Sequence, residues 1–179
     1  PMKDSGIEWI GEVPVGWTTV QLKTLLASMK NGTSATQVEY ETNYQVTRIE
    51  TISDGVINYS KTGNVHHFAG LCEHKLNVGD ILLSHINSLE KVGNAAIYDG
   101  SKILFSGMNL LRLVPKNGVH QKWLLYFIKS SYFIATIQSI AKHAINQVSV
   151  SIGRLCQVQL PRSPLTEQIA IANYLDHKT

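Results

Sequence analysis

The chain has 179 residues, 44% of them hydrophobic and 16% charged, and a formal net charge of +3. This length favours one domain with a core that needs no disulfide, and the composition excludes a disordered chain. No apolar run approaches the roughly 18 residues of a membrane helix, the N-terminus is too acidic for a signal peptide, and two cysteines are typical of a reducing compartment, so we expect a cytoplasmic protein without membrane contact.

The first half of the chain is predicted to pass from an arm to a helix and then to strands. Residues up to Trp17 mix glycine, proline and aromatic residues, which indicates an arm laid over the domain. Leucines and a methionine at helical spacing predict a helix over 20–29. Apolar residues alternate over 45–52, and an Asp-Gly turn followed by 56–59 predicts a hairpin.

Further strands and two helices are predicted in the second half. The short apolar runs that indicate strands are 81–83, 95–98, 103–105 and 109–114. Their close spacing favours an antiparallel or mixed curved sheet over a wound βαβ sheet. Two apolar stripes between Trp123 and Ala141, interrupted at Ser130-Ser131, predict helices packed against that sheet. The fold class expected is therefore α+β.

The C-terminal stretch predicts one more helix after a short strand at 158–160. Ser163 can cap this helix, Pro164 suits its first position, and Glu167 complements the helix dipole from the first turn. The apolar positions that could meet a partner helix are Leu165, Ile169, Ala172 and Leu175. No stop signal follows, so we expect a domain over 1–161 and the start of a longer helix over 162–179.

The sequence lacks the motifs of catalysis and metal binding. Its densest group of metal-binding residues is His66-His67 with Cys72 and His74, and a second Cys or His pair at zinc spacing is absent. Dinucleotide-binding, phosphate-binding and nucleophile-elbow motifs are absent too, as is the Asn/Asp-Pro-Pro-aromatic stretch of adenine methyltransferases. We therefore expect recognition without catalysis, and no cofactor or metal bound by this chain.

Five short patterns follow one another along the chain in a characteristic order. They are Asp4 to Pro14 with Gly16-Trp17, Val46 to Ile49 with Gly55, Gly79 to Ser84, Phe105-Ser106 with Asn109 to Leu113, and Leu165-Thr166-Glu167-Gln168 running into Ile169 to Asp176. In this order they resemble a target recognition domain and its junction with a conserved coiled-coil helix, in the specificity (S) subunits of type I restriction-modification systems. The resemblance spans nearly the whole chain.

The resemblance implies a non-catalytic subunit, or half-subunit, that reads one half-site of a bipartite target in double-stranded DNA. It also implies docking of methyltransferase (modification) subunits, which would bring S-adenosylmethionine, and of restriction subunits in the full complex. Self-association through the C-terminal helix, the position of this domain in a longer subunit and the base sequence recognised stay open. In such subunits an arginine often follows the serine at Ser84, where this chain has His85.

The candidate DNA contacts lie in three polar loops at the ends of predicted strands. Amide, hydroxyl and cationic side chains are the groups that bind base edges and phosphates. In these loops they are Lys30, Asn31, Thr33, Ser34 and Thr36 in 30–37; Ser84, His85, Asn87, Ser88, Lys91 and Asn94 in and just before 85–94; and Lys142, His143, Asn146 and Gln147 in 142–149. For any one of them, a solvated turn without a ligand is the alternative.

Arg48 lies in a predicted strand and has two interpretations. It can form an internal ion pair with Glu50 or Asp54, or it can contact a DNA phosphate. At the level of the whole chain the alternative function is a protein-interaction module that docks a partner through its helices and does not read DNA. An enzyme is the third option, and only scattered His, Asp and Ser residues favour it.

Overall fold

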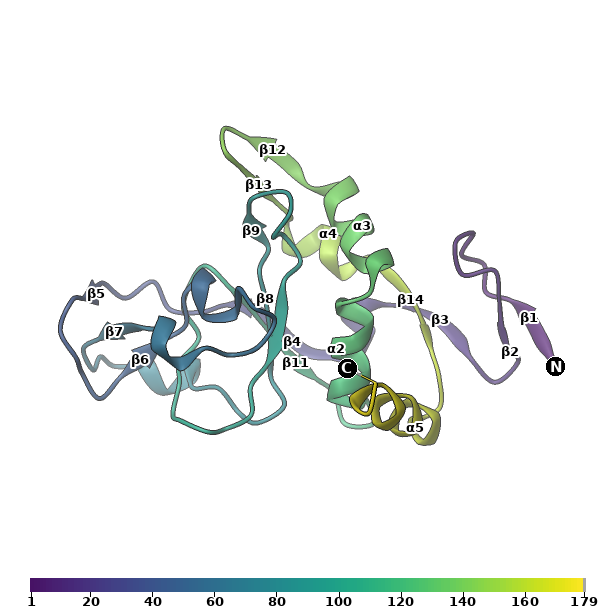
Figure 1. The fold of residues 1–179 in the computed structure, drawn as a ribbon, viewed down its shortest axis with the longest axis horizontal. Coiled ribbons are helices and arrows are strands. Elements are labelled where there is room, and N and C mark those ends of the chain that lie inside the picture. Colours follow the sequence, from purple (N-terminus) through teal and green to yellow (C-terminus); the bar gives the residue numbers. More distant parts are fainter. Residues whose placement is uncertain (179) are drawn as a thin grey trace.

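The structure, a computed structural model, describes residues 1–178. A four-stranded antiparallel sheet lies at its centre, in the order β10-β8-β11-β4 (Figure 1). The strands are β4 (Leu26–Asn31), β8 (Ile81–Leu83), β10 (Ala95–Ile97) and β11 (Leu111–Pro115). The strands predicted at 81–83, 95–98 and 109–114 are confirmed, and so is their antiparallel arrangement.

Both faces of this sheet are covered, and successive side chains alternate between them. Ile81 and Leu83 lie in one apolar cluster together with the helices, whereas Leu82 between them lies in a second cluster with Ile52 and Leu104. A sheet that is buried on both faces reads in sequence as a continuous apolar run. This explains why the short Ile-Leu-Leu segment of β8 is fully buried.

Two helices cover the first face, as predicted. They are α2 (Gln121–Ile128) and α3 (Ser131–Ile140). Ser130 separates them, because its hydroxyl caps α3 by accepting a hydrogen bond from the Phe133 backbone N–H at 3.3 Å. The shorter helices α1 (Leu22–Leu25) and α4 (Ile152–Cys156) complete this side.

A small lobe covers the second face and is seen on the left of Figure 1. Its sheet has the order β5-β7-β6 and packs around a third apolar cluster that contains Val46, Val65 and Phe105. The elements of the lobe are β5 (Gln37–Val38), β6 (Gln45–Val46), β7 (Gly63–Val65) and the 3-10 helices η1 (Ile49–Ile52), η2 (Tyr59–Lys61) and η3 (Leu71–His74).

The remaining strands form three small sheets. β1 (Met2–Asp4) pairs with β2 (Glu12–Pro14) in the N-terminal arm, and β3 (Thr18–Gln21) pairs with β14 (Gln159–Arg162). The third sheet consists of β9 (Ile86–Asn87), β12 (Lys142–Ala144) and β13 (Gln147–Ser149). Within residues 1–178, no helix has both the length and the apolar character needed to cross a membrane.

The helix α5 (Leu165–Asp176) lies against α2, and polar contacts at both of its ends hold it there (Figure 1). At its start, Trp17 Nε1 donates to the Glu167 carboxylate at 2.6 Å. At its end, the Asp176 carboxylate accepts from Lys122 Nζ at 2.5 Å and from the Tyr126 hydroxyl at 2.6 Å. The placement of Glu167 in the first turn is confirmed. The domain boundary at 161 stays a prediction.

The helix predicted over 20–29 is wrong beyond its first turn. Only α1 is helical, and from Leu26 the chain forms β4, which pairs with β11 along its length. Met29 lies opposite Leu113, so it packs as a strand residue. This pairing with a segment more than 80 positions away overrides the local helical spacing.

Two further predictions in the strand-rich part are wrong. The hairpin over 45–59 does not form, because Thr51 Oγ1 accepts from the Arg48 backbone N–H at 2.8 Å and donates to the Lys61 carbonyl at 2.6 Å, which stabilises η1 and η2 instead. The strand at 103–105 is reduced to isolated bridges of Phe105 with Val46 and Lys75.

The cap predicted for α5 is also wrong. Pro164 is the N-cap, no side chain caps the helix, and the buried Ser163 hydroxyl has no hydrogen-bond partner within residues 1–178. The start of the helix is instead bound by Gln168, whose side-chain Nε2 donates to the Ser163 carbonyl.

Candidate nucleic-acid interface

The three predicted loops meet around the segment 85–94. β9 of this segment pairs with β13 of the third loop, so that Asn87 lies opposite Val148. In the first loop, Asn31 Nδ2 lies 3.1 Å from His85 Nε2. Residues that are more than 50 positions apart in sequence are thus brought to one side of the molecule, where β9, β12 and β13 lie together (Figure 1).

The third loop is a β-hairpin rather than an irregular polar interruption. β12 and β13 are joined at Ile145-Asn146, and Asn146 adopts a φ of 64°, a left-handed conformation that asparagine tolerates better than most residues. Ile145 at the tip is 91% exposed. The four candidates of this loop, Lys142, His143, Asn146 and Gln147, are all exposed. A projecting two-stranded ribbon has the dimensions that a DNA major groove admits.

Three candidates lie beneath the surface and support the loops from inside. Ser84 is fully buried, and its hydroxyl accepts from Asn87 Nδ2 at 3.1 Å. Thr33 is also buried, and its hydroxyl accepts from the Ala35 backbone N–H at 3.1 Å. His85 is 7% exposed, and burial lowers its pKa below 6.5, which favours a neutral imidazole. A DNA contact of His85 itself stays a prediction.

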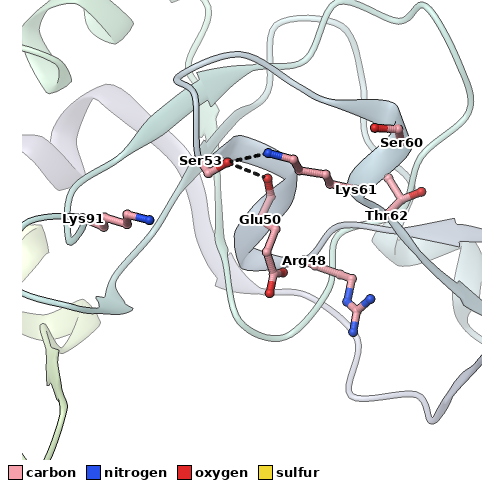
Figure 2. Close-up of a pocket in the computed structure, with 7 residues that line it drawn as sticks. All are labelled: Arg48, Glu50, Ser53, Ser60, Lys61, Thr62 and Lys91. Carbon is pink, nitrogen blue, oxygen red and sulfur yellow. Dashed lines mark hydrogen bonds between the residues drawn. The ribbon is translucent and has the colours of Figure 1, made fainter.

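A basic hollow of about 500 Å³ lies beside the loop 85–94 (Figure 2). Its cations are Arg48, Lys61 and Lys91, and its other lining residues are Glu50, Ser53, Ser60 and Thr62. Lys91 comes from the loop 85–94 and the others come from the small lobe. Ammonium and guanidinium groups gathered with hydroxyls are suited to binding a phosphate.

The ion pair predicted as one alternative for Arg48 does not form. Arg48 is exposed, and the ion pairs found among residues 1–178 do not include it. Asp54 pairs with Lys61 instead, at 3.3 Å. The phosphate contact of Arg48 therefore stays a prediction. Lys61 was missed by sequence reasoning, because apart from its charge nothing in the predicted hairpin distinguishes it.

The remaining candidates of the first two loops are largely accessible. Lys30, Ser34, Thr36 and Ser88 are exposed. Asn94 is half-buried, and its Nδ2 donates to the Ser53 carbonyl at 3.2 Å, which links the loop 85–94 to the small lobe.

A second hollow, of about 480 Å³, lies between the loop 30–37 and the end of β7. It is lined by Thr33, Ser34, Ala35, Thr36, His66, His67 and Phe68. His66 Nε2 lies 2.7 Å from the Tyr40 hydroxyl, so this histidine has a protein partner. Across residues 1–178, no group of three or more His, Cys, Asp or Glu side chains is arranged to hold a metal ion.

The candidate partner residues of α5 differ in exposure. Ala172 is fully buried within the large apolar cluster, and Leu175 is half-buried. Leu165 and Ile169 are 43% and 39% exposed and so are accessible to a partner, as is Tyr174 at 63%. The predicted stripe is therefore covered by this domain at Ala172 and partly accessible at Leu165 and Ile169.

A comparison with known families identifies the chain. Residues 14–178 match the family model described as the type I restriction modification DNA specificity domain. The chain belongs to this family. The resemblance predicted from five short patterns is thus confirmed, and the loops described above are the loops of a type I specificity domain.

Relatives of this specificity domain are longer proteins. The chain is 41% identical over 170 residues to a curated protein of Methanocaldococcus jannaschii, named for the specificity subunit of the type I restriction enzyme MjaX. That match covers 93% of this chain and 40% of the relative, so the chain spans about two fifths of the relative's length.

Solved structures of type I specificity subunits share the fold. The HsdS subunit of Thermoanaerobacter tengcongensis superimposes with a TM-score of 0.66 at 20% identity, over 98% of this chain and 39% of the subunit. The M. genitalium S subunit gives 0.63 at 20% identity, over 89% of this chain and 38% of that subunit. A chain from a study of assembly and conformational transition in a type I R-M system gives 0.69 at 19% identity, over 98% of this chain and 40% of that chain.

Proposed function

We propose that this specificity domain reads one half-site of a bipartite DNA target for a type I restriction-modification enzyme. The observation that carries the proposal is the meeting of three polar loops and the basic hollow on one side of a chain that belongs to the specificity family. The domain selects the site by hydrogen bonding and changes no covalent bond. It acts in the cytoplasm on double-stranded DNA.

In this proposal the domain makes two kinds of contact with DNA, one to base edges and one to phosphates. The hairpin β12–β13 enters the major groove and offers Asn146 and Gln147 to base edges, because amide side chains can both donate to and accept from bases. Arg48, Lys61 and Lys91 hold the phosphates of the flanking strand and so set the position of the hairpin. Affinity then comes mainly from the phosphates, and specificity comes from the loops.

Partner subunits are proposed to bind through α5. Leu165 and Ile169, one turn apart on α5, are both partly exposed and offer apolar contacts that a second helix can cover, as in a coiled coil. Modification subunits docked there would bring S-adenosylmethionine and transfer the methyl group, and restriction subunits would join the full complex. A second copy of this chain is the other candidate for the same surface.

Salt dependence of DNA binding tests the phosphate contacts. We expect the logarithm of the affinity for a duplex to fall linearly with the logarithm of salt concentration between about 50 and 200 mM. Replacing Arg48 or Lys91 by alanine should weaken binding to all sequences and reduce the slope by about one for each residue. Lys3→Ala is the matched control, since Lys3 is exposed on β1 in the N-terminal arm, which lies at the opposite end of the view from the small lobe that supplies Arg48 and Lys61 (Figure 1).

The same titration separates this proposal from its alternative. An affinity that does not change with salt, or equal slopes for Lys91→Ala and Lys3→Ala, would refute the phosphate contacts. A chain that binds modification subunits but no duplex at any salt concentration would be a protein-interaction module.

A further inference from the structure

The side-chain amide of Asn31 is held by two hydrogen-bond acceptors. Its Nδ2 lies 2.7 Å from the Met108 carbonyl oxygen and 3.1 Å from His85 Nε2. A carbonyl oxygen can only accept, so the amide group must direct its nitrogen, and not its oxygen, towards Met108. One of the two amide hydrogens of Asn31 is thereby used.

His85 accepts a hydrogen bond from the second amide hydrogen of Asn31. Its Nδ1 lies 3.1 Å from the Val150 carbonyl oxygen, which only accepts, so Nδ1 carries the proton of the imidazole. A neutral imidazole with its proton on Nδ1 presents a lone pair at Nε2. Asn31 Nδ2 therefore donates to His85 Nε2. His85 is 7% exposed, and burial lowers its pKa, which agrees with a ring that holds a single proton.

The resulting chain of hydrogen bonds leaves one atom of Asn31 free. Both amide hydrogens are donated inside the protein, whereas Oδ1 has no hydrogen-bond partner among residues 1–178. Asn31 is nevertheless exposed, at the end of β4 where the loop 30–37 begins. It contacts His85 of the loop 85–94, and His85 in turn binds the carbonyl oxygen of Val150, which directly follows the hairpin strand β13. The free oxygen therefore lies at the proposed DNA interface.

An oxygen that can only accept cannot bind a phosphate, because phosphate oxygens are acceptors as well. It also cannot make the bidentate pair with adenine that a freely rotating asparagine makes, because that pair requires the amide hydrogens. We infer that Asn31 is a specificity residue whose Oδ1 accepts a hydrogen bond from a base amino group: N6 of adenine, N4 of cytosine or N2 of guanine. His85 is the positioning residue that holds the amide in this orientation. The inference rests on the proposed function.

Base analogues in the target duplex test this inference without altering the protein. The half-site is first selected from a randomised duplex pool with the chain assembled on its modification subunits. Each base of the half-site that carries an amino group is then replaced, one at a time, by the analogue that lacks it: purine for adenine, pyrimidin-2-one for cytosine and hypoxanthine for guanine. We expect one such replacement to weaken binding about three- to tenfold, as for one lost hydrogen bond.

The variant Asn31→Ala should bind the unmodified half-site about as weakly as the wild-type chain binds the half-site that carries this one analogue. Its own affinity should not fall further when that analogue is introduced. Asn117→Ala is the matched control, since Asn117 is exposed in the turn after β11, and it should keep the wild-type response. Melting temperatures of both variants show whether they are folded.

The outcomes separate the inference from the function on which it rests. If a half-site is selected but Asn31→Ala responds to every analogue as the wild-type chain does, the role of Asn31 is wrong and the proposed function stands. The inference would also be refuted if the wild-type chain and Asn31→Ala bound equally well once a base carbonyl or N7 had been removed. These base groups accept hydrogen bonds, so Asn31 would then have to be a donor. If the wild-type chain selects no half-site, the proposed function itself fails.

Discussion

Arg112 and Asp80 form an ion pair in which the carboxylate is buried and the guanidinium is partly buried. Arg112 Nε lies 2.7 Å from Asp80 Oδ2, and the side chains are 16% and 3% exposed. Asp80 also accepts from the Asn77 backbone N–H at 2.8 Å, and Arg112 Nη1 lies 3.3 Å from the Glu73 carbonyl oxygen. The pair joins β11 to the turn before β8, and so links two of the five patterns by which the family resemblance was found.

Replacing Arg112 by alanine should lower the free energy of unfolding by about 3 kcal/mol, because it leaves the Asp80 carboxylate buried without its cation. Urea denaturation measures the change. The control is Lys61→Ala, which breaks the exposed pair with Asp54 and should change stability by less than about 1 kcal/mol. If the two substitutions lowered the free energy of unfolding equally, burial would not be the reason for the contribution of the Arg112–Asp80 pair to stability.

His85 should make the stability of the domain depend on pH. Burial lowers its pKa in the folded state below 6.5, so as the pH falls below 6.5 the unfolded chain takes up a proton more readily than the folded chain. Stability is therefore lost in acid and is kept at neutral pH. Between about pH 7.5 and 5.5, the wild-type chain should lose more free energy of unfolding than His85→Gln, which does not titrate. An equal loss in both would contradict the buried neutral imidazole.

The chemistry of single residues was predictable from the sequence to the extent that it depends on residue type. The loops were identified as polar and the helices as apolar, but the exposure of Asn31 and the burial of Ser84 and His85 depend on neighbours distant in sequence. For Arg48 the sequence left an ion pair and a phosphate contact as equal alternatives; the position of Asp54 beside Lys61 removes one ion-pair partner, and the phosphate contact stays a prediction.

At the scale of elements, α5 is positioned by one buried amide. Gln168 is fully buried, its Oε1 accepts from the His120 backbone N–H at 2.9 Å, and its Nε2 donates to the Ser163 carbonyl at 2.8 Å. It therefore joins α5 to the start of α2 and to the end of β14. The Glu-Gln pair of the C-terminal pattern thus has a structural role, since Glu167 binds Trp17 and Gln168 binds the domain.

Replacing Gln168 by alanine should lower the free energy of unfolding by about 2 kcal/mol, because a buried N–H and a buried carbonyl lose their partner. Asn173→Ala on the exposed side of α5 is the matched control and should change stability by less than about 0.5 kcal/mol. Thermal denaturation of both variants checks this. No change in stability in Gln168→Ala would mean that the other contacts of α5, which include those of Glu167 and Asp176, hold it without the buried amide.

The sequence predicted some elements correctly and mispredicted others, and particular contacts explain the difference. The helices α2 and α3 were predicted from their apolar stripes and from the interruption at Ser130-Ser131, where the structure shows that Ser130 caps α3. The strand β4 was taken for a helix because its pairing with β11 has no local signal. The hairpin expected at 45–59 becomes two 3-10 helices because the Thr51 hydroxyl binds the backbone on both sides.

At the scale of the whole molecule, the candidate site is assembled from segments that the sequence keeps apart. The loops 30–37, 85–94 and 142–149 were each predicted as candidates, but their meeting through β9, β13 and Asn31 could not be read from the sequence, since it depends on the path of the chain around the central sheet. The basic hollow likewise joins Lys91 to residues of the small lobe. The family itself was predicted because its patterns are short, local and ordered along the chain.

The most direct test of this account is selection from a randomised duplex pool by the chain assembled with its modification subunits, followed by sequencing of the bound DNA. The account predicts enrichment of a short half-site, and it predicts that shortening the hairpin at Ile145-Asn146 reduces the base preference while the complex stays intact. An unenriched pool from a well-formed complex would contradict the reading of DNA sequence by this domain and would leave a protein-interaction module.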